Sequence, residues 1–138
     1  VLGGIEYQFN LMQLHADESV LPKNPAAWAS WNVHVSDALA ERCTVSYHMN
    51  TLQQLNAPVE FIVSLNSSDR VDPNAVFVER QYAHPVYTEK TLQSQQRWDD
   101  ISGHQHTYFC GAYWGWGFHE DGVKSALNVV EQINGKGL

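Results

Sequence analysis

Alternating apolar and polar positions predict a series of strands through the first two thirds of the chain. The clearest is Val59–Leu65, where every second residue from Val59 is apolar, as in a strand with one buried face. Cys43–Met49 alternates in the same way. Less regular apolar and aromatic runs predict three further strands, at Ile5–Leu14, within Ala27–Val35, and at Val76–Tyr82 with its end at Pro85.

Helical spacing of apolar residues replaces this alternation near the C-terminus. From Asp121 to Ile133, apolar residues recur three or four positions apart, which is typical of an amphipathic helix. Asn134-Gly135 supplies its stop. A polar helix is predicted at Thr88–Ile101 and a single helical turn at Thr51–Leu55, with a short apolar strand at Thr107–Ala112.

The order of these elements, with strands first and helices last, predicts an α+β fold. We expect a mainly antiparallel sheet of about five or six strands, with two helices in the C-terminal part. The length of 138 residues suits a single compact domain.

Charge and cysteine content narrow the possible partners and the compartment. The net charge is −7, and the eight lysines and arginines are scattered along the sequence, so we expect neither nucleic-acid nor membrane binding. The two cysteines, Cys43 and Cys110, are far apart, which favours a cytoplasmic location. The chain begins VLGGIEYQF without a methionine, and we expect it to continue an upstream segment.

Seven histidines raise the question of metal binding. His104, His106 and the pair His119-Glu120 could supply nitrogen and oxygen ligands to zinc, yet the chain contains none of the usual ligand spacings. We therefore expect no metal site. Cys110 could act as a nucleophile with His48, His106 or His119, but it lies in an apolar segment, where cysteine usually behaves as a small hydrophobic residue.

The segment FCGAYWGWGFHEDGVKSA, Phe109–Ala126, combines aromatic residues, glycines and an acidic helix start. A tightly packed core is one reading of it. Glycines between a strand and a helix also leave backbone N–H groups open to a ligand. Asp121 is a candidate N-cap, and its charge favours an aromatic, hydrogen-bonding ligand over a pyrophosphate.

The sequence TYFCGAYWGWGFHEDGVKSALNVVEQI resembles the closing segment of flavin-dependent amine-oxidase-like proteins, in the subgroup described as predicted NAD/FAD-binding proteins. Tyr108–Gly111 fits the final strand of that family and Gly122–Ala126 fits the start of the final helix. The resemblance extends upstream, in the same order, through Leu14–Asn32, Val45–Leu55, Phe61–Asn66 and Tyr82–Tyr87.

The resemblance implies that residues 1–103 correspond to a substrate domain and residues 104–138 to the returning strand and helix of the FAD domain. The implied cofactor-binding residues are Gly111, Phe118, Asp121, Gly122 and Val123. Trp114 and Trp116 would line the substrate pocket. His119 is the best candidate for a catalytic polar group beside the flavin.

Two features depart from the family pattern. Ala112 occupies the place of an acidic residue that contacts the cofactor, and no GxGxxG motif occurs in the chain. We therefore expect a partial flavin-dependent oxidoreductase that is not catalytic alone and needs a separate Rossmann-type half or self-association. The alternative is a free-standing, non-catalytic module that binds a small ligand or self-associates.

Overall fold

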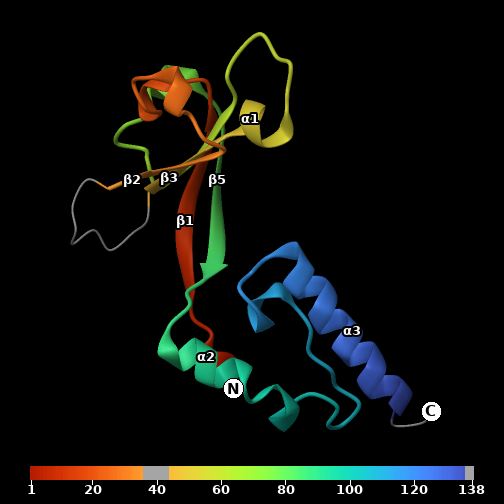
Figure 1. Ribbon diagram of the computed structural model, residues 1–138. Coiled ribbons are helices and arrows are strands. Elements are labelled where there is room, and N and C mark those ends of the chain that lie inside the picture. The colour runs from red at the N-terminus through yellow and green to blue at the C-terminus, as the bar shows by residue number, and fades with distance from the viewer. Residues whose placement is uncertain (36–43, 136–138) are drawn as a thin grey trace. The chain divides into compact units, whose positions relative to one another are not determined.

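The computed structural model describes residues 1–35 and 44–135 (Figure 1). Its contacts divide the chain into two compact units. Unit 1 contains Val1–Gln8 and the chain from His84 onward, and unit 2 is Phe9–Ala83. The prediction of a single compact domain came from the length of the chain, and the division after residue 103 came from the family resemblance. Both stay predictions.

Five strands and three α-helices make up the regular structure of these residues. The strands are β1 (Tyr7–His15), β2 (Trp31–His34), β3 (Thr44–His48), β4 (Ile62–Leu65) and β5 (Val76–Pro85). The α-helices are α1 (Met49–Gln53), α2 (Glu89–Gln95) and α3 (His119–Gly135). Short 3₁₀ helices lie at Leu2–Gly4, Glu18–Val20, Pro25–Ala27, Pro73–Ala75, Trp98–Asp100 and Ala112–Trp114.

The strands form one sheet in the order β2-β3-β4-β1-β5. Antiparallel pairing joins β2 to β3, β3 to β4, and β4 to β1. The predicted α+β fold with a mainly antiparallel sheet is therefore confirmed. The predicted helix over Asp121–Ile133 is also confirmed, as α3.

Side-chain hydrogen bonds explain where β4 begins. Asn50 in α1 accepts the N–H of Phe61 at 2.9 Å and donates to the carbonyl of Val59 at 2.9 Å. These bonds hold Val59–Phe61 outside the sheet, so β4 starts at Ile62 rather than at Val59. The strand predicted for Cys43–Met49 is present as β3, while Cys43 itself lies outside the described residues.

The helix predicted for Thr88–Ile101 is shorter than expected. Thr88 caps α2 through a reciprocal capping box with Thr91, in agreement with the predicted start. The chain then tightens, because the N–H of Arg97 bonds to the carbonyl of Ser94, three residues back. The remainder is the 3₁₀ helix Trp98–Asp100, so the prediction of one continuous helix is wrong.

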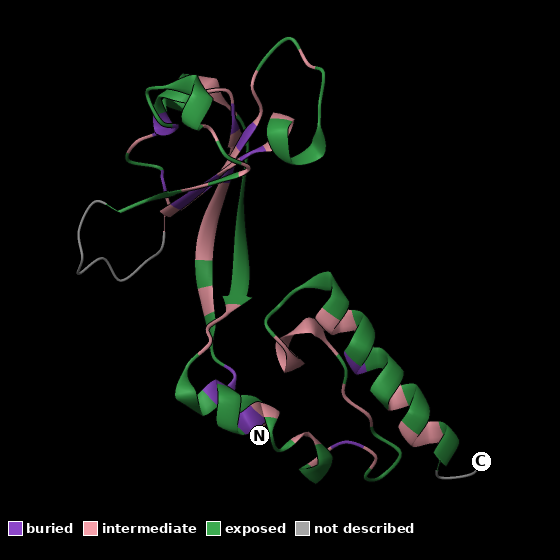
Figure 2. Ribbon diagram, in the orientation of Figure 1, coloured by how far each residue is buried: buried purple, intermediate pink, exposed green. Residues whose placement is uncertain are grey.

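The hydrophobic core of unit 2 is small. Val20, Leu21, Ile62 and Val71 form a buried cluster, and Trp28 and Val76 pack against it. Ile62 is fully buried in β4, at the centre of the sheet. Figure 2 shows that most buried residues lie in the middle of the sheet and in α2, whereas α3 is largely exposed.

The same face of the sheet also buries polar side chains. Ser46, His48 and Ser64 are buried, as is His15 on the neighbouring strand β1. Of the alternate residues, Val45 is buried, but Tyr47, Val63 and Leu65 are only half-buried. The alternation thus correctly predicts strands, but the more deeply buried face is the one that carries the serines and histidines.

Candidate functional site

The candidate site lies in unit 1, where the loop Gly111–Phe118 folds back onto the start of α3. Asp121, the third residue of α3, accepts the N–H of Trp116 at 2.9 Å and that of Phe118 at 3.0 Å. The carbonyl of Phe118 accepts the N–H groups of Asp121 and Gly122 in return. Phe118 therefore occupies the capping position, and Asp121 acts from within the first turn, so the prediction of Asp121 as the N-cap is wrong.

The capping position leaves two backbone donors open. Phenylalanine has no side-chain acceptor, so it cannot satisfy the first N–H groups of the helix. Within the part of the chain that the structure describes, the N–H groups of His119 and Glu120 take no protein acceptor. These N–H groups lie at the positive end of the helix dipole and can donate hydrogen bonds to an anionic or carbonyl oxygen.

Ser125 fastens the base of the loop to the helix. Its hydroxyl oxygen accepts the N–H of Gly111 at 2.7 Å and donates to the carbonyl of Gly122 at 3.1 Å. The Ser125 side chain is buried, although serine is polar. Gly111 and Gly122 thus lie at the contact between loop and helix, with their backbones hydrogen-bonded through one hydroxyl.

Two glycines allow the loop to close over Asp121. A Cβ added to Gly115 would lie 2.5 Å from Asp121 Cγ, closer than real Cβ atoms approach a neighbour. Gly117 has φ of +89°, and a Cβ there would lie 2.7 Å from the Tyr87 hydroxyl. The loop can follow this path only because both positions lack a side chain.

The aromatic residues predicted to line a pocket differ in their exposure and in the rings that they contact. Trp116 is 60% exposed and Phe118 is 59% exposed. Trp116 lies against Tyr87, with ring centroids 5.5 Å apart. Trp114 is half-buried and lies 5.3 Å from the ring of Tyr113. Trp114 and Trp116 thus lie in the same loop but differ in exposure and in the aromatic ring that each contacts.

Two polar atoms beside this loop are buried without a hydrogen-bond partner, namely Tyr87 Oη and Trp114 Nε1. Burial raises the pKa of Tyr87, and the negative charge of Asp121 and the proximity of Tyr7 raise it further. Burial also raises the pKa of Tyr113, which a weak interaction with Trp114 partly offsets. Both phenols stay protonated at neutral pH and can act as hydrogen-bond donors.

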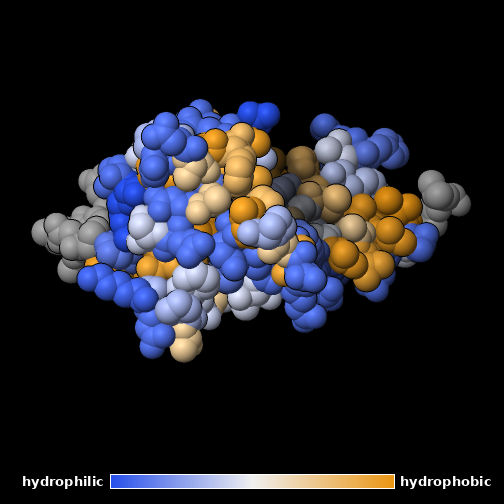
Figure 3. Space-filling model, turned by 90° about the horizontal axis from the view of Figure 1, so that it is seen from above, coloured by the Kyte–Doolittle hydropathy of each residue, from blue (hydrophilic) through white to orange (hydrophobic). Residues whose placement is uncertain are grey.

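Helix α3 leaves much of its apolar face exposed, although Val129 and Ile133 are half-buried. The residues that meet the loop are small or polar, as Gly122 and Ser125 show. Val123, Leu127 and Val130, spaced along one stripe, are each at least half exposed. In Figure 3, apolar side chains lie open on the surface over this part of unit 1. An amphipathic helix normally buries such a stripe against a neighbouring element.

The strand predicted at Thr107–Ala112 does not form. Among the described residues, only an isolated bridge between His104 and Thr107 is present here. The segment is held by side chains instead, since Trp98 Nε1 donates to the Phe109 carbonyl at 2.7 Å. A strand requires a neighbouring strand to satisfy its backbone groups, and none of the described strands pairs with this segment. The prediction of a strand, and of an exposed strand edge, is therefore wrong.

The proposed nucleophile and metal ligands are not brought together. Cys110 is an exposed free cysteine. His48, in unit 2, bonds to Thr51 and Glu60. His104 bonds to the carbonyl of Asp99 at 3.1 Å. Over residues 1–35 and 44–135, no group of three or more His, Cys, Asp or Glu residues could hold a metal ion. His119 lies exposed at the first position of α3.

Sequence reasoning missed a buried hydrogen-bond network in unit 2. His15 Nε2 lies 2.8 Å from Ser64 Oγ, which lies 2.7 Å from Ser46 Oγ. Nearby, His48 bonds to Thr51 at 2.7 Å and to Glu60 at 2.7 Å. The signal for these contacts was the recurrence of serine and histidine at every second position of the predicted strands.

Comparisons with known proteins add no assignment. No model of a protein family matches the chain, and no curated protein matches it. None of the helices in the described residues is both long enough and apolar enough to span a bilayer.

Proposed function

We propose that this chain is part of a flavin-dependent, amine-oxidase-like oxidoreductase and supplies the segment that lies against the flavin. The observation that carries the proposal is the inverted packing of α3, which buries Ser125 and leaves Val123, Leu127 and Val130 exposed. A stripe of this kind fits a helix that packs on a further body of protein. A Rossmann-type half, absent from this chain, is the body that the family resemblance implies.

The residues at the start of α3 fit the isoalloxazine ring of a flavin. The N–H groups of His119 and Glu120 form a donor pair suited to the electron-rich pyrimidine edge. The charge of Asp121 is offset by two backbone N–H groups, and Glu120 lies 3.9 Å from Lys124. Repulsion of a reduced, anionic ring by these two carboxylates is thereby reduced.

The backbone N–H groups available to a flavin belong to other residues than the Asp121 and Gly122 that the resemblance implies. The N–H groups of Asp121 and Gly122 bond to the carbonyl of Phe118, so the two preceding residues would make the contact. Gly111 and Val123 would flank the ring, and the exposed rings of Trp116 and Phe118 would border the cofactor or substrate. When bound, FAD would supply hydride acceptance at N5. The role of this chain is to position and stabilise that ring, with His119 as the candidate polar group beside it.

The sequence contains no GxGxxG motif, and this limits how tightly we expect the chain alone to bind FAD. Without a site for the adenosine and pyrophosphate, this chain would hold only the flavin end of the cofactor. We propose that it is not catalytic alone and that it acts in the cytoplasm, in keeping with its two cysteines and the unpaired Cys110.

Flavin titration tests the proposal. We expect FAD to raise the melting temperature of the full chain. We also expect Trp116 to quench the fluorescence of the bound flavin. Trp116→Leu should weaken both effects, whereas Trp31→Leu, at an exposed tryptophan of unit 2, should not. A chain that FAD neither stabilises against heat nor binds would overturn the proposal.

The second candidate function is a non-catalytic module that self-associates or binds a small ligand. The exposed stripe Val123, Leu127 and Val130 favours it as well, because two copies could cover each other's apolar faces. Sedimentation distinguishes the two functions. A concentration-dependent dimer that Leu127→Glu abolishes, with no flavin binding, would favour the module.

A further inference from the structure

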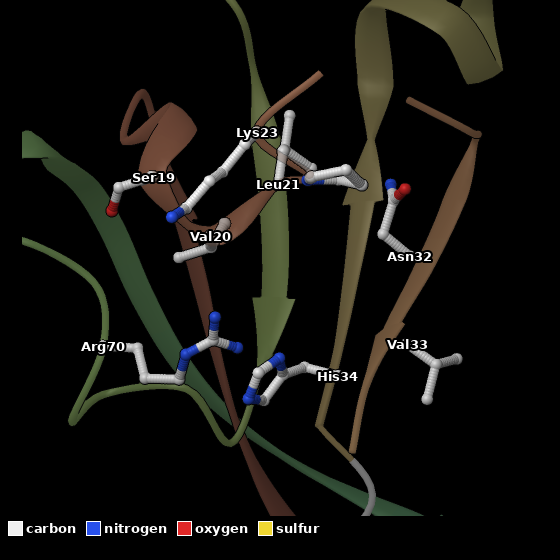
Figure 4. A pocket seen from close by; sticks show the side chains of 9 residues that line it. Ser19, Val20, Leu21, Lys23, Asn32, Val33, His34 and Arg70 are labelled. Atoms are coloured by element: carbon white, nitrogen blue, oxygen red, sulfur yellow. The ribbon is translucent and has the colours of Figure 1, made fainter. Parts of the chain in front are cut away.

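Unit 2 contains a cavity that plays no part in the flavin proposal. It has a volume of about 320 Å³ and lies between the segment Ser19–Lys23, β2 and Arg70 (Figure 4). The lining residues are Ser19, Val20, Leu21, Pro22, Lys23, Asn32, Val33, His34 and Arg70. A cavity of this size accommodates a small organic molecule.

Three nitrogen-bearing side chains face this space. Figure 4 shows Lys23, His34 and Arg70 extending toward the same opening from three different segments. Among the described residues, none of the three forms an ion pair. Arg70 Nη1 is buried and has no hydrogen-bond partner. An unpaired guanidinium N–H beside an ammonium group is a binding position for an anion.

The carboxylates of Asp17 and Asp72 bond to backbone N–H groups and form no ion pair with this cluster among the described contacts. Asp17 accepts the backbone N–H groups of Ser19 at 2.9 Å and Asp72 at 2.8 Å. Asp72 in turn accepts the N–H of Asn74 at 2.9 Å. These carboxylates thus bond to backbone donors of the turns beside the cavity, and no ion pair within residues 1–35 and 44–135 includes Arg70.

A second cavity, in unit 1, is lined by cationic side chains that are already paired with carboxylates of the protein. It has a volume of about 250 Å³ and is lined in part by Lys90 and Arg97. Lys90 pairs with Glu6 at 3.0 Å and Arg97 pairs with Asp100 at 2.7 Å. Both cations already have partners from the protein, so this cavity supplies a matched control.

The remaining wall of the unit 2 cavity is apolar and well anchored. Val20 and Leu21 belong to the buried core cluster. Trp28 Nε1 donates to the carbonyl of Pro22 at 2.8 Å and holds the segment that carries Lys23. Anchoring of this kind reduces the conformational freedom that would be lost when a ligand binds.

We propose that this cavity binds a small aliphatic carboxylate. Arg70 offers two parallel N–H groups to the carboxylate oxygens, and Lys23 adds a second positive charge. The hydrocarbon chain would lie along Val20, Leu21 and Val33. The inference is independent of the flavin proposal, because every lining residue belongs to unit 2.

Titration of the full chain with hexanoate, followed by amide chemical shifts, tests this site. We expect saturable shifts at Val20, Leu21 and Val33, and no comparable binding of the neutral isostere hexanamide. Arg70→Gln should weaken hexanoate binding by about tenfold or more, as loss of a charge-assisted hydrogen bond implies. Arg70→Lys, which keeps the charge but loses the fork, should weaken it less, and Arg97→Gln should leave it unchanged.

Several results would overturn the proposal. Equal affinity for hexanoate and hexanamide would show that charge plays no part, and equal losses in Arg70→Gln and Arg97→Gln would show that the site is not this cavity. Inorganic phosphate that binds in place of hexanoate would exclude an aliphatic ligand. Lys23→Gln, a change in a surface loop, provides a second test should Arg70→Gln fail to fold.

Discussion

The Asp121 carboxylate accepts the backbone N–H of Phe118 at 3.0 Å, and through this contact the third residue of α3 holds the residue that precedes the helix. The same oxygen accepts the N–H of Trp116 at 2.9 Å. One side chain therefore determines how the aromatic loop meets the helix. The conformation of the candidate flavin contact depends on it.

Asp121→Ala should lower the free energy of unfolding by about 1–2 kcal/mol, because two loop N–H groups lose their acceptor. Urea unfolding followed by tryptophan fluorescence measures the change. Glu120→Ala, on an exposed side chain in the same turn, should change it by less than about 0.5 kcal/mol. Equal effects of the two substitutions would contradict the role assigned to Asp121.

Gly115→Ala should displace the Asp121 carboxylate, since the added Cβ would lie 2.5 Å from Asp121 Cγ. We expect a loss of about 1–3 kcal/mol in unfolding free energy. Gly3→Ala is the control, because a Cβ at Gly3 meets nothing within 4 Å. A Gly115→Ala protein as stable as Gly3→Ala would show that the loop does not close over Asp121.

The inverted packing of α3 predicts an unusual order of sensitivity. Ser125→Val should lower the unfolding free energy by about 1–3 kcal/mol, because the N–H of Gly111 loses its buried acceptor. Leu127→Glu, on a side chain that is 56% exposed, should change it by less than about 0.5 kcal/mol. Thermal or urea unfolding measures the loss of stability in each variant. A larger loss in Leu127→Glu than in Ser125→Val would mean that α3 buries its apolar stripe.

The fold class and most strands could be predicted from the sequence because a period of two is a local property of the chain. Which face of the strands is buried was not predictable in the same way. Ser46 and Ser64 can be buried because their hydroxyl groups form a hydrogen bond with each other between the paired strands β3 and β4. That partnership depends on strand order and register, which the alternation does not specify.

The site residues could be predicted only in part, for a related reason. The spacing in α3 correctly indicates a helix, yet it gives no information on which side packs inward. The apolar segment Thr107–Ala112 has the composition of a strand, but none of the described strands pairs with it. The role of Arg70, by contrast, could not be predicted, because Arg70 and Lys23 line one cavity only after the chain has folded.

Buried His15 predicts a loss of stability in mild acid. Burial lowers its pKa, and the negative charge of Asp17 opposes this effect in part. The folded state thus binds a proton less readily than the unfolded state, whose imidazole has a pKa of about 6.5. The contribution of neutral His15 is complete above that pH and is lost as the pH falls through the folded-state pKa.

Urea unfolding at about pH 7.5 and about pH 5.5 measures this dependence. His15→Gln should flatten it, whereas His106→Asn, at an exposed residue with φ of +57° that asparagine tolerates, should not. Asp17 does not interfere in this range. Its burial alone would raise its pKa, but hydrogen bonds from Asp72 and Ser19 and the proximity of His15 lower it, so it titrates in stronger acid. Equal slopes in the parent chain and His15→Gln would contradict the prediction.

Ser64→Ala should remove the link between His15 and Ser46 and lower the unfolding free energy by about 1–3 kcal/mol, because buried polar groups are left unpaired. Ser68→Ala, at an exposed position nearby, is the control and should have almost no effect. Urea unfolding at neutral pH provides the comparison. An equal, small change in both variants would show that the network does not stabilise the sheet.

The hydrogen bonds around His15 also have a direction. His15 Nδ1 accepts the N–H of Asp17 at 3.1 Å, so the ring hydrogen of the neutral side chain must sit on Nε2 and point at Ser64. The Ser64 hydroxyl oxygen therefore accepts from His15, and a second hydrogen bond of 2.7 Å joins it to the Ser46 hydroxyl. A single tautomer of one imidazole on β1 thus fixes the Ser64 hydroxyl on β4 as an acceptor, within a chain of buried contacts that reaches Ser46 on β3. A proton added to Nδ1 would face the N–H of Asp17, and the turn that begins there would have to move first.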